Sequence, residues 1–226
     1  MFRFISFFTL LLTKWLSSLF YRYQVRWFDD LPQHDWSNIN MVVFLNHTSL
    51  FEPLFVKVAP NGFLWRLSKH LVAPGADITL NRPILGKFIK LLVPGCIPIT
   101  RKNDESWQAF LDYIKDDSIA LILPEGRMKR RDGQDKEGNP MSARGGIADI
   151  LLRVNSGKVL FVYSGGLHHI QAPGDKLPRL FKTIQVNLEL VSIDFYKELL
   201  SKSKTGSFKQ SVIKDLNLRL KHLVPQ

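Results

Sequence analysis

Short apolar runs and helical periodicities alternate along the chain. Three runs rich in Val, Ile and Phe predict strands buried on both faces: 41–45, 119–123 and 159–163. Residues 21–28 and 185–191 alternate with the period of a strand, and the second is expected nearer a sheet edge. Apolar residues recur at helical spacing in 54–58, 84–92, 106–115, 146–154 and 208–223. The pattern predicts a single α/β domain, a mixed central sheet flanked by helices.

The N-terminal segment predicts an amphipathic helix. At 100° per residue, one broad face collects Phe4, Ile5, Phe8, Leu11, Leu12, Trp15, Leu16 and Leu19. The opposite face collects Arg3, Ser6, Thr13, Lys14 and Ser17, with Leu10 as the apolar exception. A helix that spans a membrane gains nothing from a polar stripe, whereas a helix in the membrane interface needs one. We therefore expect residues 1–22 to be a membrane anchor; a helix packed on its own domain is the alternative.

Composition narrows the range of partners. The chain has 31 basic and 20 acidic residues, a net charge of +11, so an anionic partner is expected. One cysteine, Cys96, excludes an intramolecular disulfide and a zinc site built from cysteines. The aromatic residues concentrate in the N-terminal helix and the apolar runs instead of among exposed basic residues. This distribution favours a membrane surface over a nucleic acid, and no nucleic-acid partner is expected.

The stretch NHTSLFEP, residues 46–53, carries the first candidate chemistry. One interpretation is a capping box, in which Ser49 caps a helix and Glu52 folds back. Pro53 favours a helix that begins at the proline itself, which leaves Glu52 at its mouth and His47 on the loop after the strand. The carboxylate could then contact one imidazole nitrogen while the other faces outward. That geometry is typical of a general base.

Two further stretches place charged residues at predicted strand ends. Residues 95–99 form a short apolar run that leads to Arg101, and residues 123–127 read Leu-Pro-Glu-Gly-Arg before a polar loop over 127–140. Ends of strands are where open α/β sheets place their sites. The planar fork of arginine suits a phosphate, although each arginine taken singly could be a solvated surface charge.

In this order, the stretches resemble the lysophosphatidic acid acyltransferase family, within the glycerolipid acyltransferase superfamily. His47 to Glu52 matches its Asn-His block with a later acidic residue, and Gly95 to Arg101 matches its glycine-to-arginine block. Leu123 to Arg127 matches the Pro-Glu-Gly core of the third block, and 144–148 resembles a later basic-Gly start of a helix. Four features depart from the pattern: Glu52 replaces the commoner Asp, Thr100 occupies an often acidic position, Arg127-Met128 replaces Thr-Arg, and residues 159–163 lack a proline.

The resemblance implies a function and roles for the residues. It implies transfer of a fatty acyl group from acyl-CoA or acyl carrier protein to the hydroxyl of a lysophospholipid-like acceptor, 1-acylglycerol 3-phosphate in the first place. His47 would be the general base and Glu52 its orienting carboxylate. Glu125 and Gly126 would line the glycerol part of the acceptor, and Arg101 and Arg127 would bind its phosphate. No cofactor or metal is expected beyond the acyl donor.

The same resemblance implies a peripheral protein on the cytoplasmic face of a membrane, with membrane phospholipids as partners. Other acceptors remain open: another lysolipid, glycerol 3-phosphate or an amino-lipid. A non-catalytic protein that binds anionic lipids is the alternative from another class. A nucleophilic hydrolase is disfavoured because Ser164 lacks the Gly-x-Ser-x-Gly turn. Cys96 is interpreted as a small core residue, and His168 and His169 as solvated or structural side chains.

Overall fold

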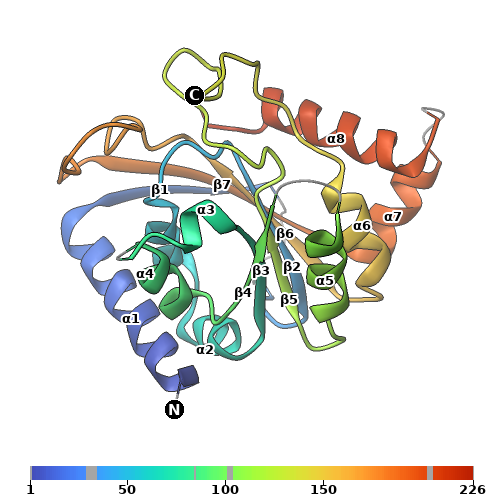
Figure 1. The fold of residues 1–226 in the computed structure, drawn as a ribbon, viewed down its shortest axis with the longest axis horizontal. Coiled ribbons are helices and arrows are strands. Elements are labelled where there is room, and N and C mark those ends of the chain that lie inside the picture. The colour runs from blue at the N-terminus through green and yellow to red at the C-terminus, as the bar shows by residue number, and fades with distance from the viewer. Residues whose placement is uncertain (1, 29–34, 84, 101–103, 203–205, 226) are drawn as a thin grey trace.

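A mixed β-sheet forms the centre of the protein (Figure 1), seen here in a computed structural model that describes residues 2–28, 35–83, 85–100, 104–202 and 206–225. Within these residues the sheet has seven strands in the order β1-β7-β6-β2-β5-β3-β4. Their bounds are β1 Arg22–Trp27, β2 Ile39–Leu45, β3 Leu71–Ala76, β4 Gly95–Ile99, β5 Ile119–Ile122, β6 Lys158–Ser164 and β7 Thr183–Ser192. The β6–β7 pair is antiparallel and the other pairs are parallel. The predicted α/β class with a mixed sheet is confirmed.

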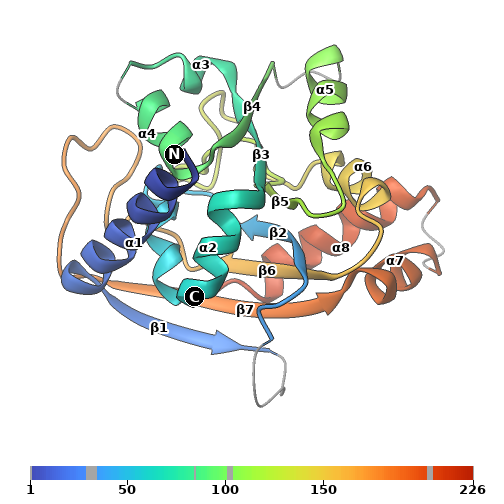
Figure 2. The same ribbon diagram turned by 90° about the horizontal axis from the view of Figure 1, so that it is seen from below.

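Helices cover both faces of the sheet (Figure 2). One face packs against α1 Phe2–Phe20, the 3₁₀ helix η1 Glu52–Val58, α2 Asn61–His70 and α4 Leu85–Leu92. The other packs against α5 Glu105–Tyr113, α6 Gly146–Arg153, α7 Ile193–Ser201 and α8 Phe208–His222, and the short α3 Asp77–Leu80 follows β3. Strand β2 supplies both cores, because Met41 and Val43 point to one face and Val42 and Phe44 to the other.

The apolar pattern located most elements but missed the strand β3 and the helices α2, α3 and α7. Pro74 and Gly75 lie inside β3, and both residue types weaken the signature of a strand. The neighbouring strand β5 pairs only with Leu71 and Val72, so Pro74 lies beyond the stretch that β5 covers. The strand therefore tolerates a residue without an N–H group at that position.

The polar stripe of α1 faces the domain. Ser6 and Ser17 are fully buried, and the Ser17 hydroxyl donates to the carbonyl of Leu54 at 3.1 Å. The Lys14 ammonium donates to the carbonyl of Ala59 at 2.7 Å and to the side chain of Asn61 at 2.8 Å. These bonds tie α1 to η1 and to the start of α2.

The apolar face of α1 is left uncovered. Phe8 is 63% exposed and Trp15 is 60% exposed. The exposed set comprises Phe4, Ile5, Phe8, Leu12, Trp15, Leu16 and Leu19. The division into two faces is the one that the sequence predicts, and the domain contacts the polar face. Among the described residues, Arg3–Phe20 is the one helical stretch whose length and composition would allow it to cross a membrane.

A network of charges holds α8 on the sheet. The Arg219 guanidinium lies 2.5 Å from a carboxylate oxygen of Glu189 on β7 and 2.6 Å from one of Asp215 on its own helix. It also lies over the ring of Phe161, 4.3 Å from the centroid. Only 11% of the Arg219 side chain is exposed, so these partners replace the water that the guanidinium loses on folding.

Replacing Arg219 with methionine is expected to lower the free energy of unfolding by about 3 kcal/mol, because two half-buried carboxylates lose their cation. Urea unfolding would measure the loss. The control is Arg153→Met, which removes a more exposed ion pair with Asp112 at 2.8 Å and should cost less than about 1 kcal/mol. Equal losses in both variants would contradict a structural role for the Arg219 network.

Candidate active site

The candidate residues meet where parallel strands end. Strands β2 and β5 are neighbours and run in the same direction, so the segments that follow them leave the same edge of the sheet. Asn46 turns the chain away from β2 with a φ of +67°, a left-handed conformation that asparagine tolerates better than most residues. Its side-chain amide donates to the carbonyl of Ser164 at 2.8 Å. The backbone conformation and this hydrogen bond therefore explain why an asparagine precedes His47.

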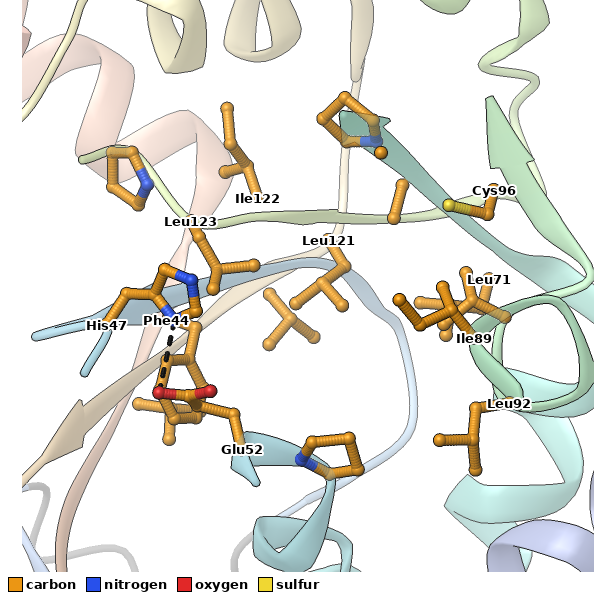
Figure 3. A pocket seen from close by; sticks show the side chains of 18 of the residues that line it. Phe44, His47, Glu52, Leu71, Ile89, Leu92, Cys96, Leu121, Ile122 and Leu123 are labelled. Atoms are coloured by element: carbon orange, nitrogen blue, oxygen red, sulfur yellow. Dashed lines mark ion pairs between the residues drawn. The ribbon is translucent and has the colours of Figure 1, made fainter. Parts of the chain in front are cut away.

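His47 and Glu52 form the predicted pair. The imidazole Nδ1 lies 3.1 Å from Oε1 of Glu52, and 16% and 10% of the two side chains are exposed (Figure 3). The same carboxylate oxygen accepts the backbone N–H of Thr48 at 2.9 Å and that of Ser49 at 2.8 Å. Glu52 thus folds back on Ser49 as in a capping box and also contacts His47. The capping-box interpretation is wrong in its other half, because the N-cap of the helix is Phe51 and no side chain among the described residues caps it.

The helix after this loop begins one residue earlier than the sequence predicts. It is a 3₁₀ helix that starts at Glu52, and Pro53 follows inside its first turn. The correction follows from the hydrogen bonds, because Phe51 accepts the N–H of Leu54 at 2.9 Å and so places Glu52 inside the first turn. Proline is still tolerated there because the first N–H groups of a helix have no partner within it.

A second carboxylate supports the loop that carries His47 from the other side. Glu125 is 4% exposed, and its Oε1 accepts the N–H of Asn46 at 2.6 Å and that of His47 at 3.4 Å. Four consecutive N–H groups, those of residues 46–49, therefore donate to two carboxylates. Burial raises the pKa of the Glu125 carboxyl, while the bonds from the backbone act to lower it. Among the described residues, Glu125 Oε2 has no hydrogen-bond partner.

A largely apolar cavity of about 620 Å³ extends from the pair into the protein. Figure 3 shows His47 and Glu52 at one end, and Cys96, Ile89 and Leu92 at the other. Its wall includes Leu10 of α1 on one face of the sheet, and Trp107 of α5 and Asp149 of α6 from the other face. The described residues that line it include two strong cations, Arg144 and Lys209.

Of the residues predicted to bind the acceptor, only some line the cavity. Gly126 lines the cavity with a φ of +66°, whereas Glu125 contacts the His47 loop and does not line the cavity. Arg127 also lies off the cavity, with its guanidinium 2.5 Å from both Asp135 and Glu137 inside the loop over 127–140. Arg101 lies outside the described residues.

Arg144 and Lys209 are cavity residues to which the sequence assigned no role. The N–H of Arg144 donates to the carbonyl of Pro124 at 2.9 Å, which fixes it beside the end of β5. Lys209 comes from the first turn of α8 and packs on Gly145, where an added Cβ would lie 2.2 Å from the Lys209 side chain. Arg144 stood inside a noted motif, but Lys209 is too far along the chain for spacing to reveal it.

Cys96 and His168, the other side chains with reactive groups considered from the sequence, have structural surroundings. Burial raises the pKa of the Cys96 thiol to about 11, so the thiol stays protonated and is a poor nucleophile. A ring nitrogen of His168 lies 2.6 Å from the carbonyl of Lys129 and so contacts the loop that follows Gly126. Among the residues described, no group of three or more His, Cys, Asp or Glu side chains could hold a metal ion.

Comparison with known proteins decides the family. The family model described as Acyltransferase matches residues 22–167, more than half of the chain. The chain belongs to the acyltransferase family. This confirms the resemblance inferred from the ordered motifs, and the protein is an acyltransferase enzyme. The segments outside the match include α1, α7 and α8, so Lys209 comes from a part of this acyltransferase that the family model does not cover.

A solved structure supports the fold. The crystal structure of the 1-acyl-sn-glycerophosphate (LPA) acyltransferase PlsC from Thermotoga maritima is similar with a TM-score of 0.55 and 17% sequence identity. The similarity covers 100% of this chain and 81% of that chain. At this identity the likeness establishes the fold alone. A comparison with curated protein sequences gave no significant match.

The buried carboxyl of Glu125 predicts a pH-dependent stability difference. A carboxyl whose folded pKa is raised favours the fold fully below its unfolded pKa of about 4.3, and that contribution is lost as the pH rises through the folded pKa. Glu125→Gln keeps an oxygen to accept the two N–H groups and cannot ionise. Its melting temperature relative to wild type should therefore be higher at about pH 7 than at about pH 4.

Thermal unfolding at several pH values would measure this difference. The control is Glu198→Gln, whose carboxylate is 61% exposed on α7 and whose melting temperature should follow wild type at every pH. A constant difference between Glu125→Gln and wild type across the pH range would show that ionisation of Glu125 is not coupled to folding.

Proposed function

We propose that this acyltransferase moves a fatty acyl group from acyl-CoA or acyl carrier protein to the hydroxyl of a lysophospholipid, 1-acylglycerol 3-phosphate in the first place, in phospholipid biosynthesis. The observation that carries the proposal is the His47–Glu52 pair at one end of a long apolar cavity. A pair of this kind suits removal of a proton from a hydroxyl, and a cavity of this kind suits an acyl chain. A non-catalytic lipid-binding protein would need the cavity but not the pair.

The proposed reaction uses the two imidazole nitrogens differently. With Nδ1 turned to Glu52, Nε2 takes the proton of the acceptor hydroxyl as its oxygen attacks the thioester carbonyl. The new C–O bond gives a tetrahedral intermediate, which collapses as the C–S bond breaks. His47 then returns the proton to the leaving thiolate. Glu52 holds the tautomer that carries its proton on Nδ1 and stabilises the imidazolium that forms, the role that the orienting carboxylate has in a catalytic triad.

The apolar cavity is the proposed site of the acyl chain. Its walls are mainly side chains of the β-strands and of η1, α2 and α4, with Leu10 from α1 and with further residues from α5, α6 and α8. Each methylene group removed from water contributes about 0.8 kcal/mol, so a chain inside the protein supplies binding energy without any polar contact. The reacting carbonyl would then lie at the His47 end, and the methyl end of the chain would point toward Cys96 (Figure 3).

Arg144 and Lys209 are the proposed partners of the acceptor phosphate. The departure at Arg127 supports this placement, because that guanidinium already has two carboxylates as partners. Lys209 Nζ lies 3.9 Å from Asp149, too far for a hydrogen bond, so a phosphate would not have to break one. Arg101, which follows β4 in the sequence and lies outside the described residues, stays a predicted phosphate ligand.

The outer face of α1 supports a peripheral location on a membrane. Aromatic and aliphatic side chains on the uncovered face are what a helix in the interface buries among lipids. We place residues 1–22 in this anchoring role and residues 23–226 in the catalytic domain. A single cysteine fits the reducing, cytoplasmic side of the membrane.

The function is tested by acyl transfer from labelled acyl-CoA and acyl carrier protein to a panel of lysolipids, glycerol 3-phosphate and amino-lipids. Wild type should transfer acyl groups, and His47→Ala and Glu52→Gln should each lose at least ~10²-fold in kcat because general-base catalysis is lost. The control His222→Ala changes an exposed histidine on α8 and should retain activity. Full activity in His47→Ala would refute the mechanism, and inactivity of wild type with every donor and acceptor would favour the lipid-binding alternative.

The phosphate site predicts a selective loss in two further variants. Arg144→Ala and Lys209→Ala should each raise KM by ~10-fold or more for a lysolipid that carries a phosphate, because each removes a charged hydrogen bond. Neither should change KM for a monoacylglycerol, which has no phosphate. Lys214→Ala alters an exposed lysine on the same helix as Lys209 and serves as the control. Equal losses with both acceptors would contradict phosphate binding at this place.

A further inference from the structure

The loop between β6 and β7 carries an exposed apolar group that the acyl-transfer site does not use. Leu177 is 79% exposed, Leu180 41% and Phe181 70%; these three side chains are called the loop surface below. In Figure 1 and Figure 2 the loop, drawn in orange, lies beside the C-terminal end of α1. The N–H of Phe181 donates to the carbonyl of Phe20 at 2.8 Å, and the two rings lie 6.0 Å apart. The loop surface is therefore continuous with the uncovered face of α1.

The backbone holds Phe181 outward in a strained conformation. Its φ is +60°, which a bulky side chain rarely adopts. Backbone bonds fix it from both sides, since Phe181 donates to Phe20 and the N–H of Arg22 donates to the carbonyl of Lys182 at 3.1 Å. Strain of this kind persists only where the surrounding structure imposes it, and it occurs mainly at functional positions. Here it keeps a phenyl ring in contact with solvent.

Exposed cations surround these apolar side chains. Lys176, Arg179 and Lys182 are exposed in the same loop, and its single acidic residue, Asp175, lies 3.7 Å from Arg131 and 3.9 Å from Arg179. A row of apolar residues with cations at its edge is the pattern by which proteins contact anionic membranes. A protein partner would not by itself require both the net positive charge and continuity with α1.

The loop is also tied to the catalytic turn. Gln171, in the first half of the loop, accepts a hydrogen bond from the hydroxyl of Ser49 at 2.9 Å. Ser49 lies between His47 and Glu52 and donates its N–H to the Glu52 carboxylate. A surface fixed to this turn and to the end of α1 has a set orientation relative to the His47 end of the cavity.

We propose that the loop surface enters the same anionic bilayer as α1, as a second membrane contact that sets the orientation of the active site. Leu177, Leu180 and Phe181 enter the boundary of the acyl chains, and the neighbouring cations contact lipid phosphates. The inference rests on the interfacial location of α1 put forward under the proposed function and is independent of the acyl-transfer chemistry. With two contacts at different places on the domain, the protein cannot roll about the axis of α1.

The test uses single-cysteine reporters, which are possible because Cys96 is the one natural cysteine. In a Cys96→Ala background, Trp15→Cys reports on α1, Leu177→Cys on the loop and Phe195→Cys on α7. Phe195 is 60% exposed, and α7 lies at the opposite end of the molecule from the loop in Figure 1. Each carries a polarity-sensitive fluorophore and is mixed with phosphatidylcholine–phosphatidylglycerol vesicles. We expect a blue shift at positions 15 and 177 and none at 195.

A shift at 15 without one at 177 would leave α1 as an anchor and overturn the second contact. No shift at either position would overturn the membrane location of both. The affinity for the same vesicles gives an independent measure: Leu177→Ser/Leu180→Ser should bind at least ~10-fold more weakly, whereas Phe195→Ser/Leu199→Ser should bind as wild type does. Unchanged melting temperatures would show that the variants are folded, and wild-type affinity in the loop variant would refute the proposal.

Discussion

Two carboxylates that accept four consecutive backbone N–H groups hold the turn that carries His47 in place. Glu125 accepts from Asn46 and His47, and Glu52 accepts from Thr48 and Ser49. Buried N–H groups need partners, and carboxylates are the strongest acceptors that the protein can offer. The turn therefore has one conformation, and the imidazole of His47 leaves it toward the cavity. The fixed backbone sets the direction of the His47 side chain, and the contact with Glu52 adds to it.

Helix α1 contributes to the wall of the cavity and still keeps an exposed apolar face. The proposed site of the acyl chain needs an apolar wall. A helix that buried all of its apolar residues in that wall would have none left to contact a membrane. Here α1 contributes Leu10 to the wall and binds the domain through Ser17 and Lys14. Its aromatic face stays outside. The place where a lipid would be taken up and the place where its chain would lie are therefore on opposite sides of one helix.

The sequence predicted the parts of the site that lie close together along the chain. His47 and Glu52 are five positions apart, and a strand before them and a proline after them constrain where both can point. Half of the alternative capping box is present, because the Glu52 carboxylate accepts the N–H of Ser49. Ser49 itself does not cap the helix, whose N-cap is Phe51 with no side-chain cap bond in the described part of the chain. Local patterns sufficed here because the interactions are local.

Spacing could not predict the contacts that depend on the tertiary fold. Arg127 follows a motif glycine, but the acidic residues later in its own loop bind it. Lys209 reaches the cavity only because α8 packs beside α6, and no motif marks that packing. Pro74 and Gly75 concealed a strand that pairs with β5 only through Leu71 and Val72 but pairs with β4 as far as Ala76. In each case the outcome depends on a contact made in the folded chain that no spacing of residues marks.

The central claim is that an acceptor hydroxyl lies at His47 Nε2 while an acyl chain fills the cavity behind it. A crystal structure with a lysolipid and a non-cleavable thioether analogue of acyl-CoA would test it most directly. The account predicts that the hydroxyl oxygen lies within about 3.2 Å of Nε2 and that the chain extends toward Cys96. A hydroxyl placed away from the imidazole, or a chain lying outside the cavity, would contradict it.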